Sequence, residues 1–218
     1  MAERPVIVLG AGGHAKVVVD LLQKLGRTVL AAIELPSPAR GRQLLGVPVE
    51  DEQTGIADHS PESTELALGL GMPTSDPISG LAKRHALAAR FEARGYRFPA
   101  LIHPAAIVGA ECAIDAGAQI MAGAVIQPGC AVGRFAIVNT GARIDHDCIL
   151  GEACHIAPGA TLGGNVRVGA QSLIGIGATV RQGITIGDRA LIAGGAMIIH
   201  DVSDGERRAG VPARGAVS

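Results

Sequence analysis

The sequence carries a six-residue repeat that runs without a break from residue 102 to residue 198. A period of six is typical of parallel β-helices, in which each unit supplies one short strand and one corner and three units close a coil. The repeated side chains then point inward and stack on those of the next coil. The repeat therefore predicts a prism of between five and six coils, with seventeen inward aliphatic positions at Ile102, Val108, Ile114, Ile120, Ile126, Val132, Val138, Ile144, Leu150, Ile156, Leu162, Val168, Ile174, Val180, Ile186, Ile192 and Ile198.

All four cysteines share one phase of this repeat, four residues after an inward aliphatic. Alanine fills most of the other positions in that phase, so the phase calls for a small side chain. Free cysteine packs as a small apolar residue, and the sequence has no C-x-x-C spacing of a redox or metal site. We therefore expect core packing rather than thiol chemistry for Cys112, Cys130, Cys148 and Cys154.

The composition suits a soluble globular protein and argues against two classes of partner. Of the 218 residues, 48% are hydrophobic, and the formal net charge is -1. Nucleic acids and anionic membranes call for a basic face, so only a local patch of phosphate size stays compatible with this charge. The first residues lack the long apolar stretch of a signal peptide, and we expect a cytoplasmic protein.

The residues that precede the repeat read as a small, Rossmann-like α/β unit of the βαβαβ type. Apolar runs and amphipathic segments alternate there, which favours a parallel sheet covered by helices. The expected strands are residues 6–9, 28–33 and 65–70, and the expected helices are residues 15–25 and 78–95. The chain then divides into an α/β domain at 1–100, a β-helix domain at 101–202 and a C-terminal tail at 203–218.

A glycine-rich turn, residues 10–14, joins the first strand to the first helix. Glycines at such a turn let backbone N–H groups approach a phosphate at the helix N-terminus. Gly10, Gly12 and Ala15, with Glu34 nineteen residues beyond Ala15, also fit the dinucleotide fingerprint. Three interpretations stay open: a purely structural turn, a nicotinamide dinucleotide site and a nucleotide-sugar diphosphate site. The unit ends near residue 100, after half a dinucleotide fold, which favours the nucleotide sugar.

Two segments give the chain a family resemblance over nearly its whole length. They are Val-Ile-Val-Leu-Gly-Ala-Gly-Gly-His-Ala-Lys-Val-Val at residues 6–18 and Asp-His-Asp-Cys at residues 145–148. Joined to the six-residue repeat, they resemble the sialic-acid O-acetyltransferase-like family of hexapeptide-repeat acyltransferases. Within it, the chain is most similar to the nucleotide-4-amino-sugar N-acetyltransferases, such as GDP-perosamine and UDP-N-acetylbacillosamine N-acetyltransferases.

The resemblance implies a fold, an assembly and a reaction. The prism would be a left-handed β-helix, and the protein would form homotrimers with active sites between subunits. Acetyl-CoA would be the co-substrate, no metal would be needed, and the acceptor would be the amino group of a nucleotide-linked 4-amino-6-deoxy sugar used for surface glycans. Asp147 after the histidine favours a substrate like GDP-perosamine over one linked to UDP.

The resemblance also assigns roles to residues of this chain. His146 would be the general base and Asp147 would raise its basicity; a histidine beside carboxylates suits proton transfer on chemical grounds as well. The acetyl-CoA site would comprise Asn139, His155, Ile176, Gly177, Ala193 and Gly194, and the sugar-nucleotide site would comprise Gly12, Gly13, His14, Glu34 and Gly69.

The sequence departs from the family in one segment, and several residues match no family position. Related proteins often have Gly-Asn or Gly-Asp-Asn after the third strand, whereas residues 69–73 read Gly-Leu-Gly-Met-Pro, which puts recognition of the base there in doubt. The remaining histidines are expected to be exposed: His59, His85, His103 and His200.

Other functions share parts of this pattern. O-acetylation of sialic acid or another sugar would use the same base on a hydroxyl group. A zinc carbonic anhydrase shares the prism and uses three histidines, but His146, His155 and His200 lack a close H-x4-H pair. A non-catalytic nucleotide-sugar sensor would bind the sugar nucleotide without turning over acetyl-CoA.

Overall fold

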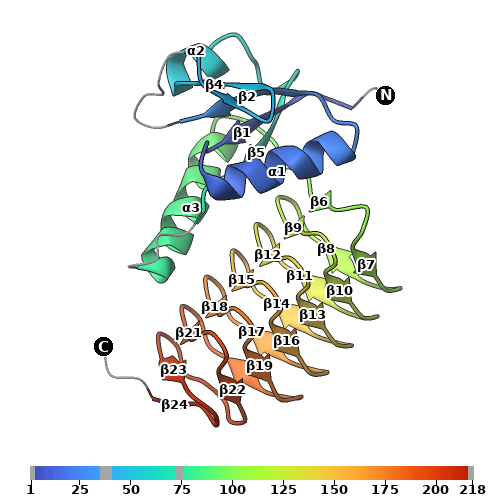
Figure 1. Ribbon diagram of the computed structural model, residues 1–218, viewed down its shortest axis with the longest axis vertical. Coiled ribbons are helices and arrows are strands. Elements are labelled where there is room, and N and C mark those ends of the chain that lie inside the picture. The colour runs from blue at the N-terminus through green and yellow to red at the C-terminus, as the bar shows by residue number, and fades with distance from the viewer. Residues whose placement is uncertain (1–2, 35–40, 72–75, 216–218) are drawn as a thin grey trace.

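The computed structural model describes residues 3–34, 41–71 and 76–215. An α/β unit lies on one face of a triangular prism (Figure 1). Both parts of the predicted fold are therefore present: a small α/β unit and, after it, a left-handed parallel β-helix. Over the described residues, no helix combines the length and apolar character needed to cross a membrane.

The α/β unit is built on a five-stranded sheet with the order β3-β4-β2-β1-β5. All neighbours are parallel except β3 and β4, which form a hairpin. The expected strands and helices are confirmed to within a few residues at their ends. The hairpin and α2 were not predicted. The bounds are β1 (Val6–Leu9), α1 (Gly13–Lys24), β2 (Val29–Ile33), β3 (Gln43–Leu44), β4 (Val47–Glu50), α2 (Glu52–Ile56), β5 (Glu65–Leu68) and α3 (Pro77–Glu92).

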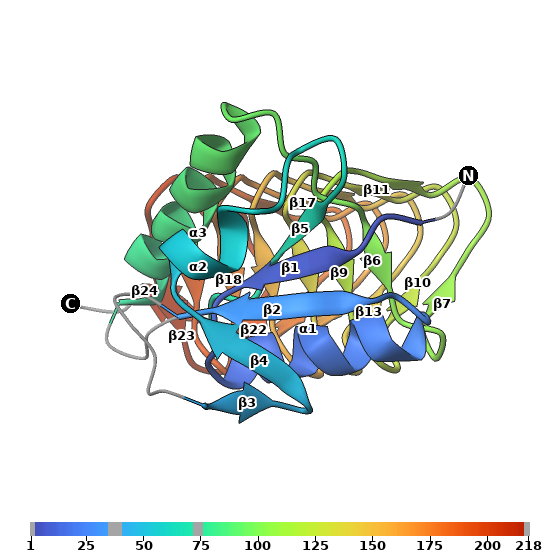
Figure 2. The same cartoon turned by 90° about the horizontal axis from the view of Figure 1, so that it is seen from above.

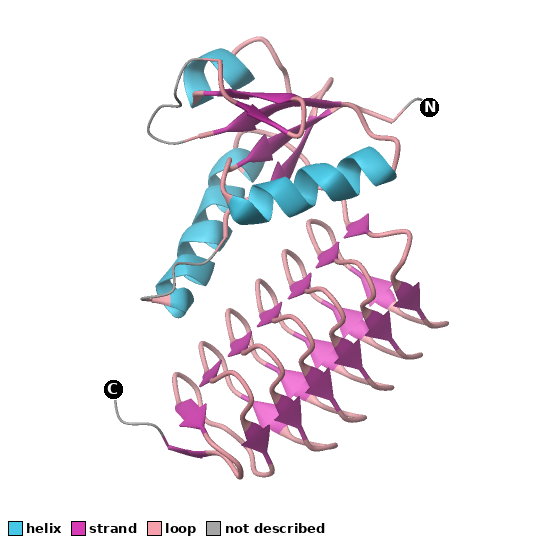
Figure 3. Cartoon of the chain, in the orientation of Figure 1, coloured by secondary structure: helices cyan, strands magenta, loops and turns pink. Residues whose placement is uncertain are grey.

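The prism has three faces, and two-residue strands visit them in turn (Figure 3). The docked face lies under the α/β unit and holds β6 (Leu101–Ile102), β9 (Gln119–Ile120), β12 (Ile137–Val138), β15 (His155–Ile156), β18 (Leu173–Ile174), β21 (Leu191–Ile192), β23 (Arg207–Ala209) and β24 (Arg214–Gly215). The second face holds β7 (Ile107–Val108), β10 (Val125–Ile126), β13 (Arg143–Ile144), β16 (Thr161–Leu162), β19 (Thr179–Val180) and β22 (Met197–Ile198). The third face holds β8 (Ala113–Ile114), β11 (Ala131–Val132), β14 (Ile149–Leu150), β17 (Arg167–Val168) and β20 (Thr185–Ile186).

The inward aliphatics form the core of the prism. Each strand pairs with the one eighteen residues away, so that Ile126 lies over Ile144 and Ile144 over Leu162. From Ile120 onward every predicted inward position is buried. Ile102, however, is exposed, because no coil precedes the first one and its side chain has no neighbour on that side.

The cysteines fill the core, as their phase predicted. Cys130, Cys148 and Cys154 are buried, Cys112 in the first coil is partly exposed, and all four are free thiols. The Cys148 thiol donates to the Gly163 carbonyl oxygen at 3.2 Å. Burial raises the pKa of both Cys148 and Cys154 to about 12, so these thiols stay protonated and unreactive at neutral pH.

Helix α1 is packed between the sheet and the docked face, so the α/β unit and the prism share an apolar core (Figure 2). Its buried residues, among them Val18 and Leu22, join Met121 and Ile137 of the prism in one cluster. On the other side of the sheet, α3 contributes Phe91 to a second cluster. This packing fixes the glycine turn before α1 directly above the docked face.

Neighbouring residues of β14 test the direction of the side chains. Leu150 is 1% exposed and points into the prism, whereas Ile149 is 40% exposed and points out. We expect Leu150→Ala to lower the free energy of unfolding by ~2–5 kcal/mol, because it leaves a cavity between stacked coils. The matched control Ile149→Ala should cost about 0.5 kcal/mol or less. Chemical denaturation measures both values, and equal costs would contradict the inward stacking.

Candidate active site

His146 and Asp147 lie at the corner between β13 and β14, on the edge that joins the second and third faces. The His146 ring nitrogen Nδ1 is 2.8 Å from Asp147 Oδ2, and both side chains are exposed. The backbone N–H of His146 donates to Asp145 Oδ1 at 2.9 Å, which holds the turn. A carboxylate can only accept, so Nδ1 carries the proton and Nε2 is the atom available as a base.

Two glycines make room for this pair, one coil before it and one coil after. A Cβ at Gly164 would lie 2.5 Å from His146 Nε2, and a Cβ at Gly129 would lie 2.5 Å from Asp147 Oδ1. Larger residues at either position would displace the histidine or its carboxylate. Neither Gly129 nor Gly164 was predicted from the sequence. Each is eighteen residues, the length of one coil, from Asp147 or His146.

The carboxylates around His146 make its imidazole more basic. The hydrogen bond to Asp147 raises the pKa of His146 above its usual value, and the charge of Asp145 adds to this effect. Surface hollows flank the histidine: one is lined by His146, Gly164 and Asn165, and another lies over the second face beside Asp145. A substrate can therefore reach Nε2 from solvent.

The residues expected to bind acetyl-CoA lie together on a different edge, the one between the docked and second faces. Asn139 follows β12, Ile176 and Gly177 follow β18, and Ala193 and Gly194 follow β21. Ile176 is 67% exposed, and a Cβ at Gly194 would lie 3.2 Å from the Ile176 carbonyl oxygen. This edge thus presents an apolar side chain beside small residues.

His155 is on the docked face next to that edge, and it is buried beneath the α/β unit. Its Nε2 is 3.0 Å from Asn139 Nδ2. Asn139 Oδ1 already accepts from the Thr140 backbone N–H, so the Asn139 amide donates and Nε2 accepts. Burial, followed by electrostatic coupling to the His14 ring and the positive charge of Arg84, lowers the pKa of His155 to about 3. His155 is therefore a neutral histidine and not an exposed corner residue.

Gly12 and Gly13 at the start of α1 are required by neither backbone geometry nor packing. Gly12 has a φ of -88°, which any residue can adopt, and a Cβ at either glycine would meet no atom within 4 Å. The surface at this helix N-terminus is open, and the helix dipole favours an anion there. By contrast, a Cβ at Gly10 would lie 2.7 Å from the Gly69 carbonyl carbon, and a Cβ at Gly69 would lie 2.6 Å from Val8 Cγ1, so close packing explains these two glycines.

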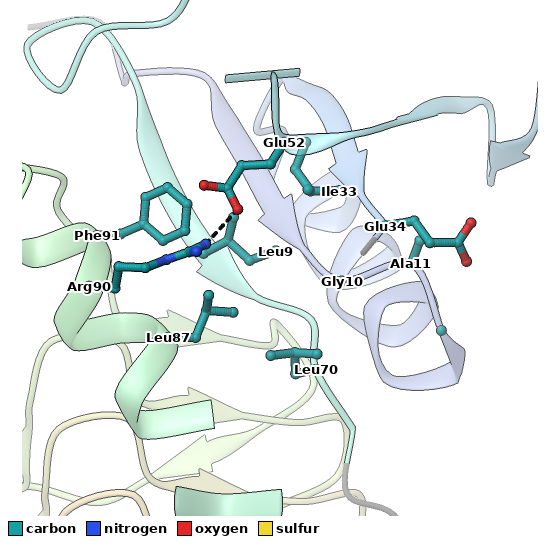
Figure 4. Close-up of a pocket in the computed structure, with 11 residues that line it drawn as sticks. Leu9, Gly10, Ala11, Ile33, Glu34, Glu52, Leu70, Leu87, Arg90 and Phe91 are labelled. Carbon is teal, nitrogen blue, oxygen red and sulfur yellow. Dashed lines mark hydrogen bonds and ion pairs between the residues drawn. The ribbon is translucent and has the colours of Figure 1, made fainter. Parts of the chain in front are cut away.

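A pocket of about 200 Å³ opens beside the glycine turn, between the sheet and α3. Leu87 and Phe91 form an apolar wall, and Arg90 lies 4.7 Å from the centre of the Phe91 ring and pairs with Glu52 at 2.6 Å (Figure 4). Glu34 is on the opposite side of the pocket. Its carboxylate forms an ion pair with Arg42, which also donates to the Ala11 carbonyl oxygen at 2.7 Å.

Two polar residues are buried between the α/β unit and the prism, and neither was predicted from the sequence. Gln119 accepts from His14 Nε2 at 3.0 Å and donates to the Leu68 carbonyl oxygen at 2.8 Å. Arg84, on α3, is 1% exposed and donates through Nη1 to the Phe135 carbonyl oxygen at 2.5 Å. Its Nε and Nη2 have no hydrogen-bond partner among the described residues. Nothing in the local sequence around Gln119 or Arg84 indicated that these residues would be buried between the α/β unit and the prism.

The expectation that the remaining histidines are exposed was right for His200 only. His59 and His85 are half-buried, and His103 is buried and accepts from the Ala105 backbone N–H through Nδ1. Met72 and Pro73, where the sequence departs from the family, lie outside the described residues. Within residues 3–34, 41–71 and 76–215, no three His, Cys, Asp or Glu side chains gather as a ligand set for a metal.

One chain thus brings the expected residues together in two groups. His14, Asn139 and His155 gather where the glycine turn meets the docked face. The pair of His146 and Asp147 is on another edge of the prism, one strand further along the chain from Asn139.

The basicity of His146 can be tested by nuclear magnetic resonance titration of its imidazole. We expect Asp147→Asn to lower the pKa of His146, because the hydrogen-bonded negative charge that stabilises the imidazolium is lost. Asp145→Asn, the matched control, should lower it less, since Asp145 acts through its charge without bonding the ring. An unchanged pKa in Asp147→Asn would contradict the role of this carboxylate.

Comparison with known proteins places these features in one family. Residues 5–74 match the PglD N-terminal domain. A histidine-to-asparagine variant of perosamine N-acetyltransferase from Caulobacter crescentus, solved with CoA and GDP-perosamine, is 33% identical over 100% of this chain and 99% of its own, with a TM-score of 0.90. The acetyltransferase domain of PglB from Neisseria gonorrhoeae is 36% identical over 98% of this chain and 100% of its own, with a TM-score of 0.88.

Other comparisons add less. WeeI from Acinetobacter baumannii, 24% identical over 98% of this chain and 100% of its own with a TM-score of 0.85, shares the fold. No curated protein sequence matches the chain. The Caulobacter and Neisseria structures are each at least 33% identical to this chain, extend over both the α/β unit and the prism, and are acetyltransferases. The chain therefore belongs to the hexapeptide-repeat nucleotide-amino-sugar acetyltransferases.

Proposed function

We propose that this protein transfers the acetyl group of acetyl-CoA to the 4-amino group of a nucleotide-linked 4-amino-6-deoxy sugar. The observation that carries the proposal is the exposed His146, whose Nδ1 is bonded to Asp147 and whose Nε2 faces solvent. The enzyme is an acetyl-CoA-dependent sugar N-acetyltransferase, like its relatives with bound CoA and GDP-perosamine or acetyl coenzyme A.

In the proposed reaction, the amine nitrogen attacks the carbonyl carbon of the thioester. A bond forms between nitrogen and carbon, and the bond between carbon and sulfur breaks. His146 Nε2 accepts the proton that the amine loses, and this proton then neutralises the departing CoA thiolate. Asp147 stabilises the imidazolium in between. Because only a neutral imidazole can accept a proton, activity should fall as the pH drops through the raised pKa of His146.

The α/β unit, residues 1–100, would hold the sugar nucleotide. The open backbone at Gly12 and Gly13 suits the diphosphate, and the pocket beside Glu34 suits the nucleoside. An apolar wall of Leu87 and Phe91 can stack on a base, and carboxylates can accept from ribose hydroxyls or from donors of the base. We assign the base to guanine in preference to uracil, since Asp147 follows His146 as in the pattern of GDP-perosamine N-acetyltransferases.

The β-helix, residues 101–202, would bind acetyl-CoA along the edge that carries Asn139, Ile176 and Ala193. Exposed Ile176 and its small neighbours can contact the pantetheine arm. Asn139 and His155 would lie nearest the thioester. We place the protein in the cytoplasm, where acetyl-CoA is available to it.

We further propose a homotrimer with active sites between subunits. His146 and Asn139 are on different edges of one prism, so a single copy does not complete the site. Three prisms packed side by side can bring the His146 edge of one copy against the Asn139 edge of the next. Each site would then take its base from one subunit and its acetyl-CoA contacts from another.

The role of His146 is tested with GDP-, UDP- and dTDP-linked 4-amino sugars, beside free sialic acid, by following thiol release from acetyl-CoA. We expect His146→Ala to lower kcat by ~10²–10⁴-fold, the contribution of a general base, and to keep acetyl-CoA binding. His59→Ala, on the α/β unit away from the site, should leave kcat unchanged. Release with sialic acid alone would indicate an O-acetyltransferase, and no release with any acceptor would refute acetyl transfer.

A mixing experiment tests the shared site. His146→Ala and Asn139→Ala should each be nearly inactive alone. After the two variants are unfolded and refolded together, heterotrimers would contain sites with an intact His146 from one copy and an intact Asn139 from another. Random mixing predicts recovery of about a quarter of the wild-type activity. Activity that stays at the level of the separate variants, in verified mixed oligomers, would place both residues in the same copy's site.

A further inference from the structure

Gln119 is a polar residue in an outward position of β9, yet it is only 1% exposed because α1 covers it. Its side-chain amide forms hydrogen bonds to two elements of the α/β unit. Oε1 is 3.0 Å from His14 Nε2 in the first turn of α1, and Nε2 donates at 2.8 Å to the carbonyl oxygen of Leu68, the last residue of β5. One side chain of the prism thus holds the glycine turn and the neighbouring strand end.

These contacts fix the position of the His14 proton. The Leu68 carbonyl can only accept, so it must face the amide nitrogen of Gln119, and the amide oxygen must face His14. An amide oxygen cannot donate, which means that His14 Nε2 carries a proton and donates it. The hydrogen-bond network therefore selects the Nε2–H tautomer of His14.

The surroundings also keep His14 neutral. Desolvation where α1 meets the docked face and the nearby charge of Arg84 lower the pKa of His14 to about 4, although the bond to Gln119 opposes this. No carboxylate among the described residues pairs with the ring. A neutral imidazole has one proton, and here it is on Nε2. Nδ1 is then a bare acceptor, and it makes no hydrogen bond to a described residue.

The chemistry of Nδ1 decides which part of a sugar nucleotide it can contact. Diphosphate oxygens at neutral pH carry no proton, so they would repel a bare ring nitrogen. A sugar hydroxyl or amino group can donate to it. We propose that Gln119 is a positioning residue, which holds His14 so that Nδ1 accepts a hydrogen bond from an O–H or N–H group of the sugar. The diphosphate then belongs to the open backbone at Gly12 and Gly13.

This inference rests on the proposed function for its ligand, but its first step needs no ligand. Nitrogen chemical shifts of the imidazole distinguish the tautomers in the wild-type protein alone. We expect His14 to be neutral and protonated on Nε2 at pH 7. A proton on Nδ1, or on both nitrogens, would overturn the proposal whether or not the protein transfers acetyl groups.

The second step compares a GDP-linked 4-amino sugar with GDP itself in equilibrium binding. Gln119→Met keeps the length of the side chain and removes both hydrogen bonds. It should weaken binding of the sugar nucleotide by ~5–10-fold, the effect of about one hydrogen bond, and leave GDP binding within about twofold. Equal weakening of both ligands would assign His14 to the diphosphate and overturn the proposal, as would unchanged binding of both.

Two further variants make the result interpretable. Gln171→Met is the matched control. Gln171 also contacts a histidine of the α/β unit, His85, at 3.3 Å, but it lies at the edge between the third and docked faces. It should bind both ligands as wild type does. Gln119→Glu keeps the contact with His14 and should favour a proton on both ring nitrogens, which converts Nδ1 into a donor. We expect it to lose sugar-nucleotide binding as Gln119→Met does, and retained binding would overturn the proposal.

The same measurements separate this proposal from the proposed function. If wild-type protein binds the GDP-linked amino sugar more tightly than GDP in a Gln119-dependent manner but releases no thiol from acetyl-CoA, acetyl transfer is refuted and the role of Gln119 stands. If thiol release is normal and Gln119→Met changes neither tautomer nor binding, the role of Gln119 is refuted and acetyl transfer stands.

Discussion

The stacking of one coil on the next, eighteen residues away, is the constraint on which the rest of the structure depends. A two-residue strand has no stability of its own, and each one here is held by hydrogen bonds to equivalent strands of the adjacent coils. The same stacking sets the geometry of the site. His146 is stacked against Gly164 of the next coil and Asp147 against Gly129 of the preceding coil, so each side chain has room because its neighbour is a glycine.

A prism with three edges also separates chemical roles along one chain. The edge with His146 offers an exposed base, and the edge with Asn139 offers small residues beside an apolar one. The docked face is occupied by the α/β unit, whose helix α1 shares a core with it. The strands visit the three faces in a fixed order. No rearrangement within one chain can therefore bring His146 to the edge that carries Asn139. Assembly of several copies is the physical route by which the two edges can meet.

Structural features that depend on the local sequence pattern could be predicted from the sequence. The period of six predicted the inward residues, the phase of the cysteines predicted their burial, and the glycine turn was found from its neighbours in the chain. Prediction failed where docking decides the environment. Gln119 looks like an ordinary surface residue until α1 packs over it, and Arg84 looks like one until α3 packs against the prism. The burial of His155 beneath the α/β unit was likewise not predicted. The roles assigned to Asn139 and Glu34 remain predictions, because neither position nor burial identifies a ligand.

Burial divides the histidines into two chemical classes, and this division follows from the same docking. His146 is exposed beside carboxylates, which raise its pKa and stabilise its protonated form. His14 and His155 lie where the α/β unit meets the docked face, near the charge of Arg84. Desolvation and that charge lower their pKa values, so both stay neutral. A neutral histidine in a fixed tautomer offers one donor and one acceptor at known atoms, which suits recognition. Docking of the α/β unit therefore gives the histidines of the docked face a protonation behaviour opposite to that of His146.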